Sequence, residues 1–153
     1  MSRLELKVPP PAVLAAVGLL MWAVAALSGP PRLPRAWRVS AATILAVGGA
    51  AIGLVAVGSF RGARTTVHPT RPEHSSALVT TGIYRRTRNP MYLALLLALL
   101  AFAALLGKVR SHALSAVIVL YIDRFQIGPE ERVLRSLFGE EFERYCERVR
   151  RWI

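Results

Sequence analysis

The chain has 153 residues, a length that fits a single domain. Hydrophobic residues make up 54% of it and charged residues only 19%, which argues against an ordinary soluble domain and makes a membrane protein the first class to consider. The single cysteine, Cys146, excludes an internal disulfide and a cysteine-based zinc site, and the three histidines match no metal-ligand spacing, so we expect no metal.

The net charge of +11 would also suit a protein that binds nucleic acid. The charges, however, are confined to short segments between long uncharged runs. Basic residues at such positions are explained by anionic lipid headgroups and by the preference for positive charge on the cytoplasmic side. We therefore expect a membrane as the partner of the basic segments, and no nucleic acid.

Four uncharged runs predict an all-α integral membrane fold in one domain, residues 1–153, with about four transmembrane helices. A helix needs about 20 apolar residues to cross the hydrocarbon core. The third and fourth spans should form a helical hairpin, and the fourth crosses only if Asp123 and Arg124 belong to it. The expected spans are residues 9–28, 39–60, 90–107 and 111–127.

The first run has a second interpretation as a signal peptide. The sequence Gly29-Pro30-Pro31 directly after it disfavours cleavage, and the apolar run is long for a signal. Small residues are dense in the second run and indicate close helix packing.

The lysines and arginines predict which side of the membrane each segment faces. With four spans, the N-terminal segment carries two of them, the segment from Arg61 to Arg88 six, and the tail from Arg124 onward seven. The two opposite loops carry three and two. The richer side should be cytoplasmic, so both termini of this multi-pass protein are expected in the cytoplasm.

The tail, residues 129–152, is predicted to form amphipathic helices on the cytoplasmic side. Large apolar residues recur there at steps of three and four, with arginines and glutamates between them. We expect Gly139 to break this tail into two pieces.

Residues 78–92 combine turn residues, three arginines and two tyrosines directly before the third span. Pro90 suits the first turn of a helix and Asn89 its cap, and free N–H groups at that helix start could hold a carboxylate. On composition alone, the segment is better explained as a basic membrane anchor with a helix cap.

Two acidic features follow the fourth run. Glu130 and Glu131 are adjacent carboxylates that would suit a cationic ligand such as an ammonium group, or would simply begin a helix. Asp123 and Arg124 lie at the edge of the fourth run, where ionisable residues indicate either function or the membrane boundary.

Taken together, these segments resemble the isoprenylcysteine carboxyl methyltransferase and phospholipid methyltransferase superfamily. Residues 78–84 match its Leu-Val-Thr-x-Gly-x-Tyr pattern, and residues 88–92 match the arginine, proline and tyrosine that open a helix. The Glu130-Glu131 pair and the Phe138-Gly139 pair follow in the same order. The resemblance covers about residues 65–153, and its specificity comes from the ordered combination of motifs.

The sequence departs from the family pattern at three places. Asn89 replaces the usual histidine. The asparagine side chain can still form hydrogen bonds, but it has no titratable group. Ala94 stands where a glycine often follows the tyrosine. Gln126 aligns with an arginine that contacts substrate in some members, and Arg124 is the nearest substitute.

The resemblance implies an S-adenosylmethionine-dependent methyltransferase with a lipophilic acceptor: an isoprenylcysteine carboxylate, a phospholipid, a quinol or a thiol. Glu130, helped by Glu131, would hold the ammonium of the cofactor, and Arg88 with the amides near Asn89 would hold its carboxylate. The implied cofactor-binding residues are Ser76, Ala77, Leu78, Val79, Tyr84, Arg88, Asn89, Pro90, Met91, Tyr92, Glu130 and Glu131.

Methyl transfer from a sulfonium needs alignment and exclusion of water, so we expect binding residues and no catalytic triad. An amine or phenol acceptor would need a base, for which Asp123 and Glu131 are the candidates, with Arg124 as a further candidate catalytic residue. Two alternatives share part of the pattern: an NADPH-dependent oxidoreductase like the membrane sterol reductases, and a non-catalytic membrane scaffold.

Overall fold

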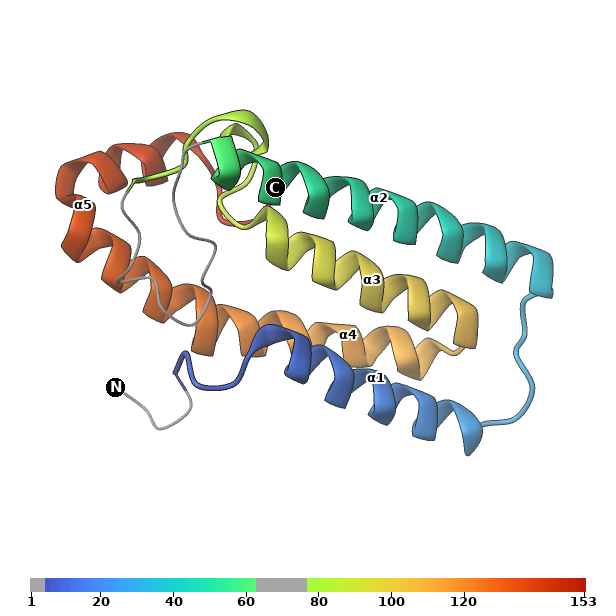
Figure 1. Ribbon diagram of the computed structural model, residues 1–153. Coiled ribbons are helices and arrows are strands. Elements are labelled where there is room, and N and C mark those ends of the chain that lie inside the picture. The colour runs from blue at the N-terminus through green and yellow to red at the C-terminus, as the bar shows by residue number, and fades with distance from the viewer. Residues whose placement is uncertain (1–4, 63–76) are drawn as a thin grey trace.

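The computed structural model describes residues 5–62 and 77–153, and within these the regular structure is entirely helical, as predicted (Figure 1). Gly107, at a φ of 65°, ends α3 in the left-handed conformation and begins the turn into α4. The elements are α1 (Pro10–Ala26), α2 (Arg35–Gly62), the 3₁₀ turn η2 (Gly82–Arg85), α3 (Pro90–Leu106), α4 (Val109–Ile122), the π-helical turn η3 (Asp123–Ile127) and α5 (Gly128–Arg148).

Four helices lie side by side in a bundle (Figure 1). Helix α2 packs on α3, α3 on α4, and α1 on both α3 and α4. Helix α5 continues the direction of α4 beyond the bundle and then folds back. As a result, the start of α1, the end of α2, the start of α3 and both halves of α5 gather at one end of the molecule.

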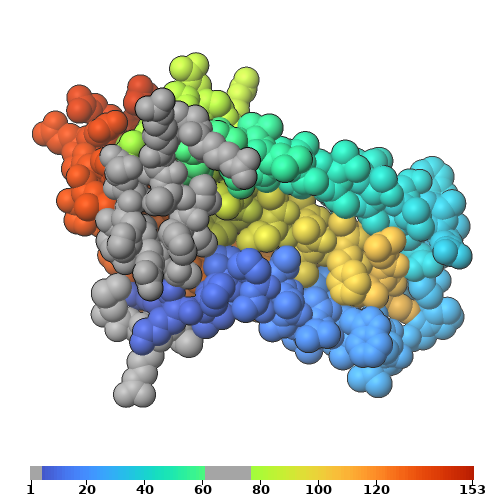
Figure 2. Space-filling model, viewed as in Figure 1, coloured from blue at the N-terminus to red at the C-terminus, as the bar shows by residue number. Residues whose placement is uncertain are grey.

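One described helix, α2, is long and apolar enough over Arg35–Phe60 to cross a membrane. Helices α1 and α3 are also apolar but have 17 residues each. In Figure 2, α2, α3 and α1 form adjacent bands along one face of the molecule. Large apolar side chains of α1 and α2 are exposed, which is unfavourable in water; they include Leu19, Leu20, Trp22, Ile44, Val47, Leu54 and Val55.

Small residues let α2 and α3 approach closely, as the sequence indicates. A Cβ atom added at Gly49 would lie 3.1 Å from Cβ of Leu97 and 3.2 Å from the carbonyl oxygen of Ala94. At Gly53, the added atom would lie 3.5 Å from Cβ of Ala94. A larger residue at position 49 would therefore push the two helices apart.

Pro129 explains the π-helical turn between α4 and α5. Proline has no N–H, and its ring cannot approach the carbonyl four residues earlier, which here belongs to Phe125. The helical turn takes up one extra residue here, and the N–H of Gly128 donates to the carbonyl of Asp123, five residues earlier. The carbonyl of Phe125 instead accepts a hydrogen bond from the N–H of Leu6 at 3.1 Å. The N-terminal segment thus supplies the donor that proline lacks.

Residues 5–9 form an N-terminal strap across this turn. The Glu5 side chain is only 4% exposed and pairs with Arg132 at 2.8 Å and with Arg124 at 3.3 Å. The side-chain amide of Gln126 donates to the carbonyl of Val8 at 2.7 Å. These contacts fix the start of α1 against the start of α5.

Glu5→Gln is expected to lower the free energy of unfolding by about 1–3 kcal/mol, because it weakens the acceptor of two guanidinium groups at a buried position. Glu143→Gln is the matched control, since Glu143 pairs with Arg135 where both side chains are about half exposed. We expect it to cost less than about 1 kcal/mol. Unfolding in detergent, followed by circular dichroism, measures both changes, and equal losses would contradict the anchoring role of Glu5.

Candidate active site

A cavity of about 850 Å³ lies where the N-terminal end of α3 meets α2, η2 and α5. This volume is in the range of small-molecule binding sites. Its walls along α2 and α3 are apolar, with small residues such as Ala50, Gly53 and Ala98. Its polar end holds the only charged side chains in the described part of the wall, which are Arg88, Glu130 and Glu131.

Most of the residues predicted to bind a cofactor meet at this cavity. Pro90 is buried at the first position of α3, outside the wall, and Ser76 lies outside the described residues. The predicted residues in the wall are Ala77, Leu78, Val79, Tyr84, Arg88, Asn89, Met91, Tyr92, Glu130 and Glu131.

Asp123 and Arg124, two of the three candidate catalytic residues, are not part of the cavity wall. Arg124 pairs with Glu5 of the N-terminal strap. Asp123 lies 3.6 Å from the guanidinium of Arg151 and accepts a hydrogen bond from the indole of Trp152 at 3.2 Å. Among the three candidates, the structure brings only Glu131 to the cavity.

Asn89 occupies the cap position of α3, as predicted, but its side chain does not cap the helix. Its amide donates instead to the carbonyl of Arg151 at 2.9 Å, while its backbone N–H donates to the hydroxyl of Thr87 at 3.2 Å. The asparagine in place of histidine therefore holds the C-terminal segment. The first-turn N–H groups of Met91 and Tyr92 have no backbone acceptor in the described residues.

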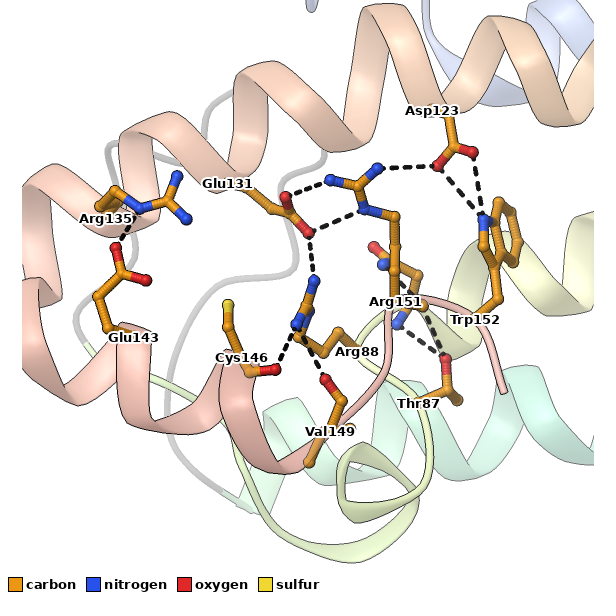
Figure 3. A network of polar contacts seen from close by, with 11 residues as sticks. Thr87, Arg88, Asp123, Glu131, Arg135, Glu143, Cys146, Val149, Arg151 and Trp152 are labelled. Carbon is orange, nitrogen blue, oxygen red and sulfur yellow. Dashed lines mark hydrogen bonds and ion pairs between the residues drawn. The ribbon is translucent and has the colours of Figure 1, made fainter.

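Arg88 ties the turn before α3 to α5 (Figure 3). One terminal nitrogen donates to the carbonyls of Cys146 at 3.0 Å and Val149 at 2.9 Å, and the other pairs with Glu131 at 3.0 Å. Both terminal nitrogens of the guanidinium that was expected to hold a cofactor carboxylate are thus engaged by the protein. Its Nε atom is buried and has no partner in the described part of the chain.

The two adjacent glutamates differ in their environment. Glu130 is partly buried in the cavity wall, and this burial, together with the charge of Glu131, raises its pKa to about 7. The hydroxyl of Tyr92, which donates to Glu130 at 3.1 Å, offsets only part of that rise. Burial also acts on Glu131, but hydrogen bonds and charges from Arg151 and Arg88 outweigh it and lower the pKa.

The fold-back of α5 completes the cavity. Gly139, at a φ of 50°, interrupts α5 as predicted, and the second half returns toward η2. There the hydroxyl of Tyr145 donates to the carbonyl of Tyr84 at 2.8 Å, and Phe142 packs in the same apolar cluster. Phe60 of α2 meets the ring of Tyr84 edge-on, with centroids 5.4 Å apart. These contacts hold Tyr84 in the cavity wall.

The sequence interpretation missed two parts of the site. One is the face of α2 in the wall, where Ala46, Ala50, Gly53 and Val57 recur at helical spacing, a signal that was present in the sequence. The other is Arg151, whose side chain and carbonyl both hold the polar end together. No local signal separates Arg151 from the other arginines of the tail.

Comparisons with known proteins identify relatives of this chain. The family model for phospholipid methyltransferases matches residues 37–141. An uncharacterized protein of Haemophilus influenzae is 46% identical over 63 residues, which cover 41% of this chain and 100% of that protein. Protein-S-isoprenylcysteine O-methyltransferase of Schizosaccharomyces pombe is 35% identical over 72 residues, 47% of this chain but only 30% of that enzyme. No solved structure matches the chain.

The raised pKa of Glu130 predicts a pH-dependent stability. The carboxyl binds its proton more tightly in the folded chain, with a pKa of about 7, than in the unfolded chain, where the value is 4.5. Its stabilising contribution is therefore fully present below pH 4.5 and is lost as the pH rises through 7.

From pH 5.5 to 8, we expect the unfolding free energy of the wild type to fall by about 1–2 kcal/mol more than that of Glu130→Gln. Denaturant unfolding across this range measures both, and parallel curves would show that Glu130 has an ordinary pKa.

Proposed function

This chain belongs to the phospholipid methyltransferase family, and we propose that it transfers a methyl group from S-adenosylmethionine to a lipophilic acceptor at a membrane surface. The observation that carries the proposal is the partly buried carboxylate of Glu130, which lines the cavity and has no cationic partner among the described residues. A carboxylate in such a place is costly to ionise unless a ligand brings the positive charge.

The residues present fit such a cofactor. Glu130 suits an ammonium group, and the rings of Tyr84 and Tyr92 in the same wall can face a positively charged sulfur. The N–H groups of Met91 and Tyr92 at the start of α3 are donors left for a carboxylate. When bound, S-adenosylmethionine supplies a methyl group on a sulfonium that leaves as a neutral thioether.

The protein then has to bind the cofactor and the acceptor, align them for the transfer, and exclude water from the site. Apolar side chains of α2, α3 and α5 surround the polar end of the cavity, which limits access of water to it. The cavity wall extends along α2 to Ala50 and Ala46, both exposed, and along α3 to Ala98. We infer that the acceptor enters along this apolar side, while the cofactor occupies the polar end.

The titratable groups of the cavity favour an acceptor that arrives deprotonated. Glu131 is a poor base because two arginines lower its pKa, and Asp123 lies outside the wall. Burial raises the pKa of Tyr84, so this phenol stays protonated. A carboxylate or a thiolate needs no proton removed, so we favour these acceptors over an amine or a quinol.

We also propose that the chain is embedded in a membrane with its cavity at the cytoplasmic side. The long apolar helix α2 and the exposed apolar side chains of α1 and α2 support this placement. Arginines gather at the end of the bundle where α3 and α5 begin, which the preference for positive charge in the cytoplasm explains. In this arrangement both termini would be cytoplasmic.

The charge of the cavity bears on the NADPH alternative. Binding the phosphates of NADPH needs several available cationic groups. In the described wall, Arg88 is the only basic residue, it is held by Glu131 and two carbonyls, and two carboxylates accompany it. This balance favours a cationic ligand. A non-catalytic scaffold would bind neither S-adenosylmethionine nor NADPH.

Binding of S-adenosylmethionine should depend on the ionisation of Glu130. Because the cation requires the carboxylate, we expect the affinity to fall about tenfold for each pH unit below 7 and to level off above it. Glu130→Gln should bind at least about tenfold more weakly at pH 8 and lose the pH dependence. Calorimetric titration of detergent-purified protein measures this, with Glu141→Gln, an exposed acid outside the cavity, as the control. Absence of binding by folded wild type would end the proposal.

The proposed acceptor path can be tested on α2. Ala50→Leu should lower the rate of methyl transfer to membrane lipid extracts by about tenfold or more while leaving the affinity for S-adenosylmethionine within about twofold, because the added side chain narrows only the apolar part of the cavity. Ala51→Leu is the matched control, since Ala51 is exposed on the same helix outside the cavity wall. Equal effects of the two variants on transfer would contradict the path.

A further inference from the structure

The two glutamates at the polar end of the cavity have unequal partners. Glu131 accepts hydrogen bonds from Arg88 at 3.0 Å and from two nitrogens of Arg151, at 2.6 and 3.1 Å. Glu130, one residue earlier, accepts only the hydroxyl of Tyr92 in the described part of the chain. Within residues 5–62 and 77–153, the negative charge of Glu131 is therefore compensated by two arginines, whereas Glu130 meets no arginine or lysine.

Arg151 contacts both Glu131 at the start of α5 and the turn before α3 (Figure 3). Its guanidinium lies between Glu131 and Asp123, which is 3.6 Å away. Its backbone carbonyl accepts hydrogen bonds from the amide of Asn89 at 2.9 Å and from the hydroxyl of Thr87 at 3.2 Å. One residue near the C-terminus thus connects the turn before α3 to the start of α5.

We propose that Arg151 is a positioning residue for cation binding by Glu130: it compensates Glu131 and holds the turn before α3, so that Glu130 is the carboxylate available to the ligand. This role rests on the proposed cofactor binding. It assigns the two glutamates different tasks, since Glu131 orients arginines and Glu130 meets the positive charge. The family resemblance implied instead that Glu131 helps Glu130 to hold the ammonium.

Loss of the Arg151 charge would change the ionisation of Glu130. Without the guanidinium of Arg151, the ionised Glu131 would repel a charge on Glu130 more strongly, because the site excludes much of the water that would screen it. Glu130 would then hold its proton to a higher pH. Among the residues that the structure describes, the other charged or titratable groups around Glu130 are Tyr92 on α3, Tyr84 on η2, Tyr145 on α5, Arg88 before α3 and, beyond Glu131, Asp123.

The test compares Arg151→Gln, which keeps the backbone carbonyl but removes the charge, with Arg151→Lys, which restores it. Arg150→Gln is the matched control, because Arg150 is an exposed neighbour of equal charge whose side chain takes no part in these contacts. Without cofactor, infrared titration of the protonated carboxyl stretch gives the midpoint of Glu130, assigned by its loss in Glu130→Gln. The pH dependence of S-adenosylmethionine binding is then measured on the same variants.

We expect both midpoints to rise by about 0.5–1 pH unit in Arg151→Gln, to return toward wild type in Arg151→Lys, and to stay unchanged in Arg150→Gln. If Arg151→Gln does not fold, Arg151→Met, which retains the packing of the aliphatic stem, carries the same prediction. A merely structural role would lower the melting temperature and leave the midpoints in place, and that result would overturn the proposal.

The two proposals can fail separately. Wild-type protein that binds S-adenosylmethionine, with unshifted midpoints in folded Arg151→Gln, overturns the role of Arg151 alone. Folded wild type that binds no S-adenosylmethionine overturns the proposed function and, with it, the positioning role.

Discussion

The enclosed carboxylate of Glu130 is the constraint on which the rest of the site depends. An ionised acid with little access to water is unfavourable unless a positive charge meets it. The described part of the chain places Arg88 and Arg151 on the neighbouring Glu131 and leaves Glu130 with a phenol. Among the described lining residues, two carboxylates therefore accompany one arginine, a balance that a small cationic ligand would even out.

The surrounding fold can be understood as the support for that carboxylate. Pro129 forces the π-helical turn, and the N-terminal strap satisfies the carbonyl that the proline leaves without a donor. The break at Gly139 returns the second half of α5 to η2, where Tyr145 and Tyr84 meet. Segments from both ends of the chain therefore fix the start of α5, and with it the direction in which Glu130 faces.

The sequence was sufficient to place the turn before α3 and the glutamate pair at one end of a helical bundle. Charge distribution and the ordered motifs carried that prediction, because both reflect local composition. The partners of Arg88 were not predictable, since they are backbone carbonyls of Cys146 and Val149 that arrive only when α5 folds back. Asp123 and Arg124 fell outside the cavity because the π-helical turn adds a residue and rotates α5 relative to α4. Helical spacing alone does not reveal such a shift.

An experimental structure of the protein with bound S-adenosylmethionine tests the central claim most directly. The account predicts the ammonium nitrogen within hydrogen-bond distance of the Glu130 carboxylate, the cofactor carboxylate at the first turn of α3, and Glu131 still paired with Arg88 and Arg151. A cofactor bound outside the cavity between α2, α3 and α5, or a Glu130 that faces no positive charge in the complex, would contradict it.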